Sequence, residues 1–173
     1  MRVVAGAYKG RRLQAPRGVR TRPTADRVRE TLFSLLGDVS GHRVLDLYAG
    51  SGALGIEALS RGAASATFVE RDQRAVAAIR RNLEAVDADA EVRKQDALRF
   101  LTSARGTFDL VFVDPPYDSA VRLGGSLSAR LPAVLTREAR IVTESDKRKP
   151  LELSQPLELE RVYGDTRIAV HRA

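Results

Sequence analysis

Residues 46–55 read Asp-Leu-Tyr-Ala-Gly-Ser-Gly-Ala-Leu-Gly, and this stretch decides the fold. It overlaps residues 43–48, Arg-Val-Leu-Asp-Leu-Tyr, which predict a β-strand, and it leads into a helical pattern. Gly50 and Gly52 allow a tight turn and the close approach of a ligand to the backbone, and Gly55 allows the helix to pack closely on the sheet. The stretch therefore predicts a strand–turn–helix unit of an α/β nucleotide-binding fold.

Two carboxylates accompany this glycine turn. Glu70 follows Gly50 by twenty residues, at the end of the next predicted strand, where a carboxylate can accept hydrogen bonds from both ribose hydroxyls of an adenosine group. The glycine pattern alone fits NAD, FAD or S-adenosylmethionine. Asp46 suits the α-amino group of S-adenosylmethionine and would repel the pyrophosphate of a dinucleotide. S-adenosylmethionine is therefore favoured, while a dinucleotide and an ordinary turn packed by glycines stay open.

The rest of the chain alternates strand and helix patterns. Strands are expected at 66–70, 91–93, 108–113 and 139–143, helices after Asp72, near 98–101 and near 120–130, and a hairpin over 157–170. This alternation predicts a parallel sheet with helices on both faces, and the hairpin adds an antiparallel strand at one edge. Ahead of the first strand, two short strands at 2–6 and 11–15 and a helix capped by Thr24 are expected.

A second motif, Asp114-Pro115-Pro116-Tyr117, follows the most apolar predicted strand. Ligands of open α/β folds bind at the carboxyl ends of strands. Two prolines make a rigid rim without backbone donors, so the Asp114 carboxylate and the Pro115 carbonyl form a pair of acceptors. Such a pair suits an –NH₂ group, and Tyr117 offers a face on which a base can stack. The structural alternative is a strand stopped by prolines, with an aspartate there by chance.

Together the two motifs predict methyl transfer from a sulfonium to the exocyclic amine of a nucleobase, with no metal. Positioning and desolvation carry such a reaction. Asp96, after the third strand, is expected to contact the adenine amino group, to cap a helix, or both. Glu144 and Ser145 end the fifth strand and are interpreted as its structural rim.

The composition excludes several kinds of site. The chain has 173 residues, no cysteine and two histidines, His42 and His171. This length predicts one main domain, and the lack of cysteine excludes disulfides, thiolate metal sites and a cysteine nucleophile. We read no signal peptide and no long apolar run, so a cytoplasmic protein is expected. No exposed apolar stripe argues for a dimer, so a monomer is expected. The expected division is a basic hairpin arm at 1–20, a linking helix at 21–41 and the main domain at 42–173.

Positive charge is concentrated at the start of the chain. Residues 1–30 carry nine basic and two acidic side chains, a net charge of +7 that equals the formal net charge of the whole chain. This asymmetry is typical of proteins that bind a phosphate backbone, and a solvated arginine-rich tail is the alternative. The predicted RNA-binding residues are Arg2, Lys9, Arg11, Arg12, Arg17, Arg20, Arg22, Thr24 and Arg27.

The motifs resemble those of the bacterial RsmD family. The resemblance rests on Arg22-Pro23-Thr24 with residues 26–33 (Asp-Arg-Val-Arg-Glu-Thr-Leu-Phe), on residues 46–62 and on residues 113–117, and it covers nearly the full length. It implies an S-adenosylmethionine-dependent methyltransferase of class I fold, with a seven-stranded sheet and an N-terminal β-hairpin that grips RNA. It also implies methylation of N2 of guanine(966) in 16S rRNA, as free RNA, an assembly intermediate or the 30S subunit.

The resemblance also assigns roles to single residues. Asp114, Pro115 and Tyr117 are expected to hold the target guanine beside Pro116, and Tyr48 to narrow the cofactor pocket. The predicted S-adenosylmethionine site comprises Asp46, Tyr48, Gly50, Ser51, Gly52, Gly55, Glu70, Arg71, Asp96 and Ala97. The alternatives are a DNA adenine-N6 or cytosine-N4 methyltransferase, an NAD-dependent oxidoreductase, and an inactive nucleic-acid-binding module of the same fold.

Overall fold

A seven-stranded sheet forms the centre of the computed structural model, which describes residues 1–16, 26–104 and 106–173, with the side chains of Tyr117 and Asp118 left aside. The strand order is β3-β2-β1-β4-β5-β7-β6, and β7 alone runs opposite to the other six strands. The strands are β1 (Arg43–Leu47), β2 (Ser65–Glu70), β3 (Glu91–Lys94), β4 (Phe108–Val113), β5 (Leu135–Asp146), β6 (Leu157–Tyr163) and β7 (Thr166–Arg172). The expected seven-stranded, mostly parallel sheet is thereby confirmed.

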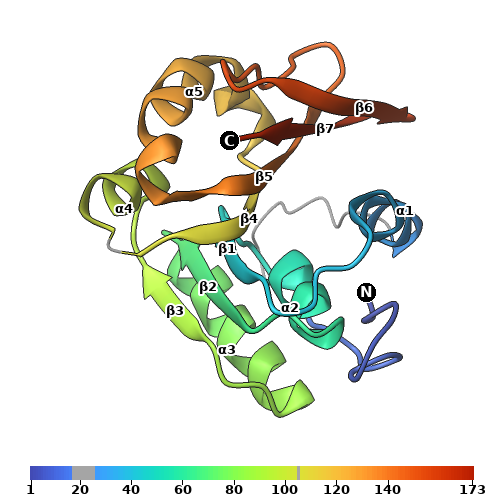
Figure 1. The fold of residues 1–173 in the computed structure, drawn as a ribbon. Coiled ribbons are helices and arrows are strands. Elements are labelled where there is room, and N and C mark those ends of the chain that lie inside the picture. The colour runs from blue at the N-terminus through green and yellow to red at the C-terminus, as the bar shows by residue number, and fades with distance from the viewer. Residues whose placement is uncertain (17–25, 105) are drawn as a thin grey trace.

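Helices cover both faces of this sheet (Figure 1). They are α1 (Asp26–Leu36), α2 (Ala53–Ser60), α3 (Gln73–Val86), α4 (Ala97–Ser103), α5 (Tyr117–Arg130) and the short 3-10 helix η1 (Leu131–Val134). One buried cluster joins α1, α2 and α3 to sheet residues such as Val44 and Phe112, and the other joins α4, α5 and η1 to Leu45 and Val111. Neighbouring strand residues thus serve opposite faces, as the strand period of two requires.

Local sequence signals account for most element ends. The Asp72 carboxylate accepts hydrogen bonds from the N–H groups of Arg74 and Ala75 and begins α3, as expected. β4 is buried along most of its length, which fits a central parallel strand. β5 is longer than the predicted 139–143, because both its neighbours, β4 and β7, pair with it. Among the described residues, no helix has the length and apolar character needed to cross a membrane.

The N-terminal segment, residues 1–16, pairs with itself in the antiparallel sense that the sequence predicts, but the pairing is shorter than the two strands expected at 2–6 and 11–15. A single antiparallel bridge joins Arg2 to Arg12, with further backbone hydrogen bonds such as Leu13 N–H to Met1 O at 3.0 Å. The segment is also packed on the domain, since Val3 and Leu13 are buried in the core that contains α2. Part of its polar backbone donates to side chains of α2 and α3 instead of to a facing strand, which satisfies these groups without a full strand ladder.

A buried ion pair stabilises the packing of the N-terminal segment, α1 and α2. Arg29 and Glu57 have fully buried side chains whose Nε and Oε2 atoms lie 3.4 Å apart. Glu57 also accepts hydrogen bonds from the N–H groups of Val4 at 2.7 Å and Ala5 at 2.9 Å, and it pairs with Arg61 at 2.9 Å. The positive charge of Arg29 is therefore neutralised inside the protein, although Arg29 is one of the nine basic residues counted in residues 1–30.

Candidate active site

The glycine turn lies at the edge of the sheet where β1, β2, β4 and β5 end, which we call the carboxyl edge. Gly50 has φ 56° and Gly52 has φ 77°, backbone conformations that glycine adopts without steric cost. Gly52 is also the residue that precedes the first turn of α2. The turn therefore has the conformation that a close backbone approach to a ligand requires.

Gly55 and Asp46 fix α2 to the sheet. The Gly55 N–H donates to Asp46 Oδ2 at 3.0 Å. A Cβ at Gly55 would meet the Phe68 ring at 2.3 Å, so only glycine fits there. The packing role predicted for Gly55 is thus confirmed.

The Asp46 carboxyl is an unusual acid because it is almost fully buried. Burial, together with the charge of Glu70, raises the pKa of Asp46 to about 8 against the opposing hydrogen bond from Gly55. A cation beside this carboxyl would favour its charged form and lower that pKa. The site thus has the electrostatic character that an ammonium or a sulfonium prefers.

Glu70, at the end of β2, stabilises the glycine turn through a hydrogen bond to its backbone. Its Oε2 accepts from the Gly50 N–H at 3.0 Å and its Oε1 from the Asp72 N–H at 2.8 Å. A carboxylate offers about four acceptor positions, so both oxygens keep capacity for the hydroxyls of a ribose. The residue that sequence reasoning assigned to the ribose therefore lies directly against the predicted turn.

Tyr48 stands in the left-handed region with φ 59°, which is rare for a residue with a side chain. Its hydroxyl is buried and has no hydrogen-bond partner within the described ranges. Burial, with the charge of Asp96, raises the pKa of Tyr48 to about 12, and Arg71 opposes this. The tyrosine thus lies near two other predicted cofactor residues, and backbone strain of this kind clusters at functional sites.

Asp96 caps α4, where its carboxylate accepts from the Arg99 N–H at 3.1 Å. The predicted capping role is confirmed, and a contact with adenine remains a prediction. Ala97 is buried at the start of α4, whereas Arg71 is exposed at the end of β2. The predicted cofactor residues thus come from the ends of β1, β2 and β3.

The motif Asp114-Pro115-Pro116-Tyr117 follows the end of β4, and we call it the Asp114 corner. Burial raises the pKa of Asp114 well above its usual value, and the charges of Glu144 and Asp46 raise it further. Pro115 is buried, and Pro116 is the exposed residue before α5, with ψ 133°. The Pro116 carbonyl accepts from the Ser119 N–H at 2.9 Å, which holds the first turn of α5. Tyr117 begins this helix, but its side chain lies outside the described part.

Strand register brings the two motifs together. Asp46 pairs with Phe112, and Val113 pairs with Thr143, so Asp114 is two residues beyond the level of Asp46 and on the same face of the sheet. Glu144 is then level with Asp114 on the next strand. Three carboxyl groups meet at this point of the carboxyl edge, next to the glycine turn.

Sequence reasoning missed the role of Glu144 in this group. It is only 5% exposed, and its charge acts on Asp114. The signal was its position at the end of a strand that pairs with β4, which the sequence alone did not reveal. A second missed residue is Asn82 of α3, which donates to the carbonyl oxygens of Ser51 at 2.9 Å and Gln14 at 3.0 Å. It ties the N-terminal segment to the glycine turn.

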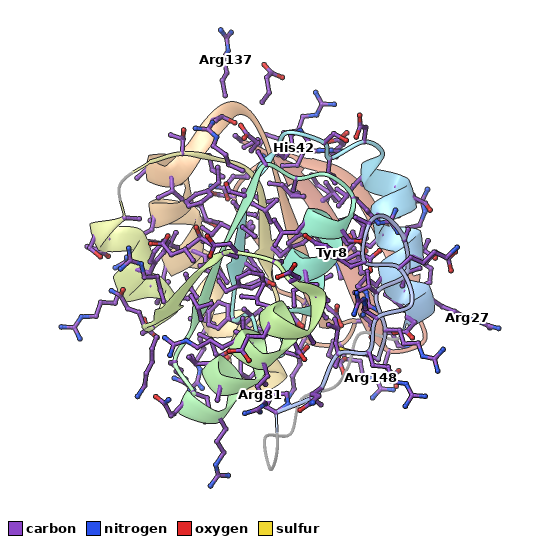
Figure 2. All side chains as sticks on the ribbon, turned by 90° about the horizontal axis from the view of Figure 1, so that it is seen from below. Tyr8, Arg27, His42, Arg81, Arg137 and Arg148 are labelled. Atoms are coloured by element: carbon purple, nitrogen blue, oxygen red, sulfur yellow. The ribbon has the colours of Figure 1, made fainter. Side chains whose placement is uncertain are left out.

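The predicted RNA-binding residues are only partly brought to the site. Met1 contacts Ser51 at the glycine turn, whereas Ala7 and Tyr8 bind the backbone and hydroxyl of Ser60, at the far end of α2. Lys9 is therefore nearer that far end, while Arg2 is close to Asp26. Arg2, Lys9, Arg11, Arg12 and Arg27 are exposed, and Figure 2 shows Arg27 extending into solvent from α1. Arg17, Arg20, Arg22 and Thr24 lie outside the described residues.

Comparisons with known proteins agree with this geometry. The family model described as "Conserved hypothetical protein 95" matches residues 1–172. "Putative rRNA methyltransferase YlbH" of Bacillus subtilis is 40% identical, over 99% of this chain and 98% of the relative. "Ribosomal RNA small subunit methyltransferase D" of Escherichia coli is 44% identical, over 68% of this chain and 60% of the relative.

A solved structure, "Putative methyltransferase yhhF from Escherichia coli", has a TM-score of 0.84 and 36% identity, over 99% of this chain and 97% of its own. The sheet order and the single antiparallel strand are those of a class I methyltransferase. The chain therefore belongs to the family described as Conserved hypothetical protein 95, the RsmD family of S-adenosylmethionine-dependent methyltransferases.

Proposed function

We propose that the chain transfers a methyl group from S-adenosylmethionine to N2 of a guanine in 16S ribosomal RNA, at the position known as guanine(966) in this family. The observation that carries the proposal is the Asp114 corner beside the glycine turn. The full-length similarity to "Putative rRNA methyltransferase YlbH" supports RNA as the substrate class. Since ribosomal RNA is the substrate, the activity belongs in the cytoplasm.

The chain's own residues suit the cofactor. Glu70 would accept the ribose hydroxyls, Asp96 the adenine amino group, and the backbone of Gly50 and Gly52 would lie against the ligand. Asp46 would face the positive end, where an ammonium and a sulfonium stabilise its ionised form. The bound cofactor supplies an electrophilic methyl carbon.

The guanine amine attacks that carbon in line with the bond to sulfur. As the C–N bond forms, the C–S bond breaks, and its electron pair stays on sulfur to give S-adenosylhomocysteine. Asp114 holds the amine through one N–H, and the Pro115 carbonyl is proposed to hold the other. The raised pKa of Asp114 suits a group that takes the amine proton once the C–N bond has formed.

The remaining contribution is positioning. Holding amine and methyl carbon in reacting geometry can contribute about 7–11 kcal/mol to the lowering of the barrier. The prolines after β4 and the packing of Gly55 on Phe68 make the two halves of the site rigid relative to one another. A base inside a helix must be turned out to reach the corner, so loops are favoured targets.

The direct experiment offers radiolabelled S-adenosylmethionine with 30S particles that lack the modification, with naked 16S rRNA and with duplex DNA. We expect label in 16S rRNA, and N2-methylguanosine after nuclease digestion, at the proposed position. Label in N6-methyladenine or N4-methylcytosine of DNA would instead support the DNA methyltransferase alternative. Cofactor binding without transfer to any of the three would support an inactive module.

A further inference from the structure

We propose that three consecutive cations after β5, Lys147, Arg148 and Lys149, bind the phosphate backbone of the RNA strand that carries the target base. We call them the β5 loop. This inference rests on the proposed function, and it adds a second RNA contact outside the basic N-terminal segment. All three side chains are exposed.

Strand register brings the β5 loop to the reacting corner. Glu144 is level with Asp114 on the neighbouring strand, about 4.8 Å away across the sheet. β5 ends two residues later at Asp146, and the loop follows directly at the carboxyl edge. Figure 2 shows Arg148 far from Arg137 and His42, which lie near the opposite edge where strands begin. A nucleotide with its base at Asp114 would therefore have its phosphates near this loop.

The loop is held in place by its own backbone. The Lys147 N–H donates to the Asp165 carbonyl at 2.9 Å, which ties the loop to the turn between β6 and β7. The Arg148 N–H donates to Asp146 Oδ1 at 2.8 Å, and the Lys149 N–H donates to the Asp146 carbonyl at 3.0 Å. Since the backbone is already ordered, binding a ligand there costs little conformational entropy.

Charge explains why an RNA substrate needs these cations. The base must enter a corner where Asp46, Asp114 and Glu144 gather, and each of these carboxyl groups repels phosphates in its ionised form. Cations beside the corner offset that repulsion and attract the strand. The basic N-terminal segment serves this end only in part, because Ala7 and Tyr8 bind Ser60 at the far end of α2.

The ion pairs of the loop are exchangeable. Lys147 and Arg148 lie 3.2 Å and 3.3 Å from Asp165, and the Arg148 side chain is 73% exposed. Surface pairs of this kind are worth about 1 kcal/mol or less, so a phosphate can replace the carboxylate as partner. The loop is thus an ordered but available anion-binding surface.

The test compares Lys147→Ala/Arg148→Ala/Lys149→Ala with the parent chain, and Arg148→Ala with Arg137→Ala as an exposed arginine at the other edge. The dissociation constant for a 16S rRNA fragment is measured by fluorescence anisotropy over a range of salt concentrations. The Kd for S-adenosylmethionine and the melting temperature are measured alongside.

We expect the triple variant to bind RNA about tenfold or more weakly at low salt, with a salt slope shallower by about 2, since each lost phosphate contact changes it by about 0.7. Arg148→Ala weakens binding and Arg137→Ala does not, while cofactor affinity and melting temperature stay at the parent values. A triple variant with the parent's Kd and slope overturns the inference.

Two further outcomes separate the causes of failure. If methyl transfer falls with assembled 30S particles while binding to naked RNA is unchanged, the loop contacts a ribosomal protein and the inference is wrong. If the parent chain transfers no methyl group to RNA, the proposed function fails, and the inference fails with it.

Discussion

At the scale of single residues, the carboxyl groups at the carboxyl edge differ in their surroundings, and this difference separates their roles. Asp46 is buried and Asp114 is half-buried, and both have raised pKa values, whereas Glu70 accepts two backbone hydrogen bonds. A buried acid that gains a cationic neighbour changes its charge state, and an acid bound to the backbone braces the turn. Each role has its own test.

Replacing Asp114 tests its role toward the amine. We expect Asp114→Ala to lower the rate of methyl transfer about 10²–10⁴-fold, the usual contribution of one proton-accepting group. The Kd for S-adenosylmethionine, measured by isothermal titration, should stay within about tenfold of the parent value, because the change affects the transition state. Loss of cofactor binding in proportion to activity would contradict the assignment.

Replacing Asp46 tests the consequence of its burial. Its pKa is about 8 in the folded chain and 3.8 as an ordinary aspartate, so the folded chain binds more protons between these values. The contribution of Asp46 to stability is therefore fully present below pH 3.8 and is lost as the pH rises from 3.8 to about 8. Asp46→Asn removes this loss, so from pH 5 to 8 the variant should gain on the parent by up to about 1.4 kcal/mol per pH unit.

Urea unfolding at several pH values measures this gain, and Asp109→Asn is the control. Arg43 holds the pKa of Asp109 at about 2, so the contribution of Asp109 to stability is already complete from pH 5 to 8. Asp109→Asn should therefore shift the unfolding curve without changing its pH slope. If the free energy of unfolding of Asp46→Asn also changes with pH as that of the parent does, the inference from the burial of Asp46 is wrong.

At the scale of elements, most strands and helices could be predicted from periodicity and caps. The glycine turn, the Asp72 cap and the buried strand β4 all carried strong local signals. The N-terminal segment did not, because the side chains that satisfy its backbone, such as Glu57 and Ser60, are more than fifty residues away in sequence. The position of Glu144 beside Asp114 also depended on strand pairing, which local patterns do not specify.

Two glycines give a matched test of how α2 packs on the sheet. Gly55→Ala drives a Cβ into the Phe68 ring, so we expect the free energy of unfolding to fall by about 1–3 kcal/mol. Gly125 lies in helix α5 with open space around it, and alanine there should stabilise by about 0.5–1 kcal/mol. Denaturant unfolding compares the two, and equal effects would contradict the close packing.

The buried pair between α1 and α2 offers another element-scale prediction. Arg29→Met leaves the Glu57 carboxylate without its buried partner, so we expect a loss of roughly 3–5 kcal/mol in the free energy of unfolding. Arg27→Met, on the same helix but exposed, should change it by less than about 0.5 kcal/mol. Similar losses of unfolding free energy in both variants would show that the Arg29–Glu57 pair does not stabilise the packing of α1.

At the scale of the whole molecule, the basic N-terminal segment is also part of the packed domain. The basic start of the chain was expected to form an arm, yet residues 1–16 pack on α2, bury Val3 and Leu13 and contact the glycine turn through Met1. Removing them would expose core and destabilise the domain. Substitution of exposed cations is therefore the cleaner way to test RNA binding by this segment.

The central claim is tested most directly in an Escherichia coli strain that lacks its own small subunit methyltransferase D. Nucleosides from the 16S rRNA of this strain, carrying the chain on a plasmid, are digested and measured by mass spectrometry. The account predicts that the parent chain restores one N2-methylguanosine and that Asp114→Ala does not. Full restoration by Asp114→Ala would contradict it, because the amine would then be methylated without the residue assigned to hold it.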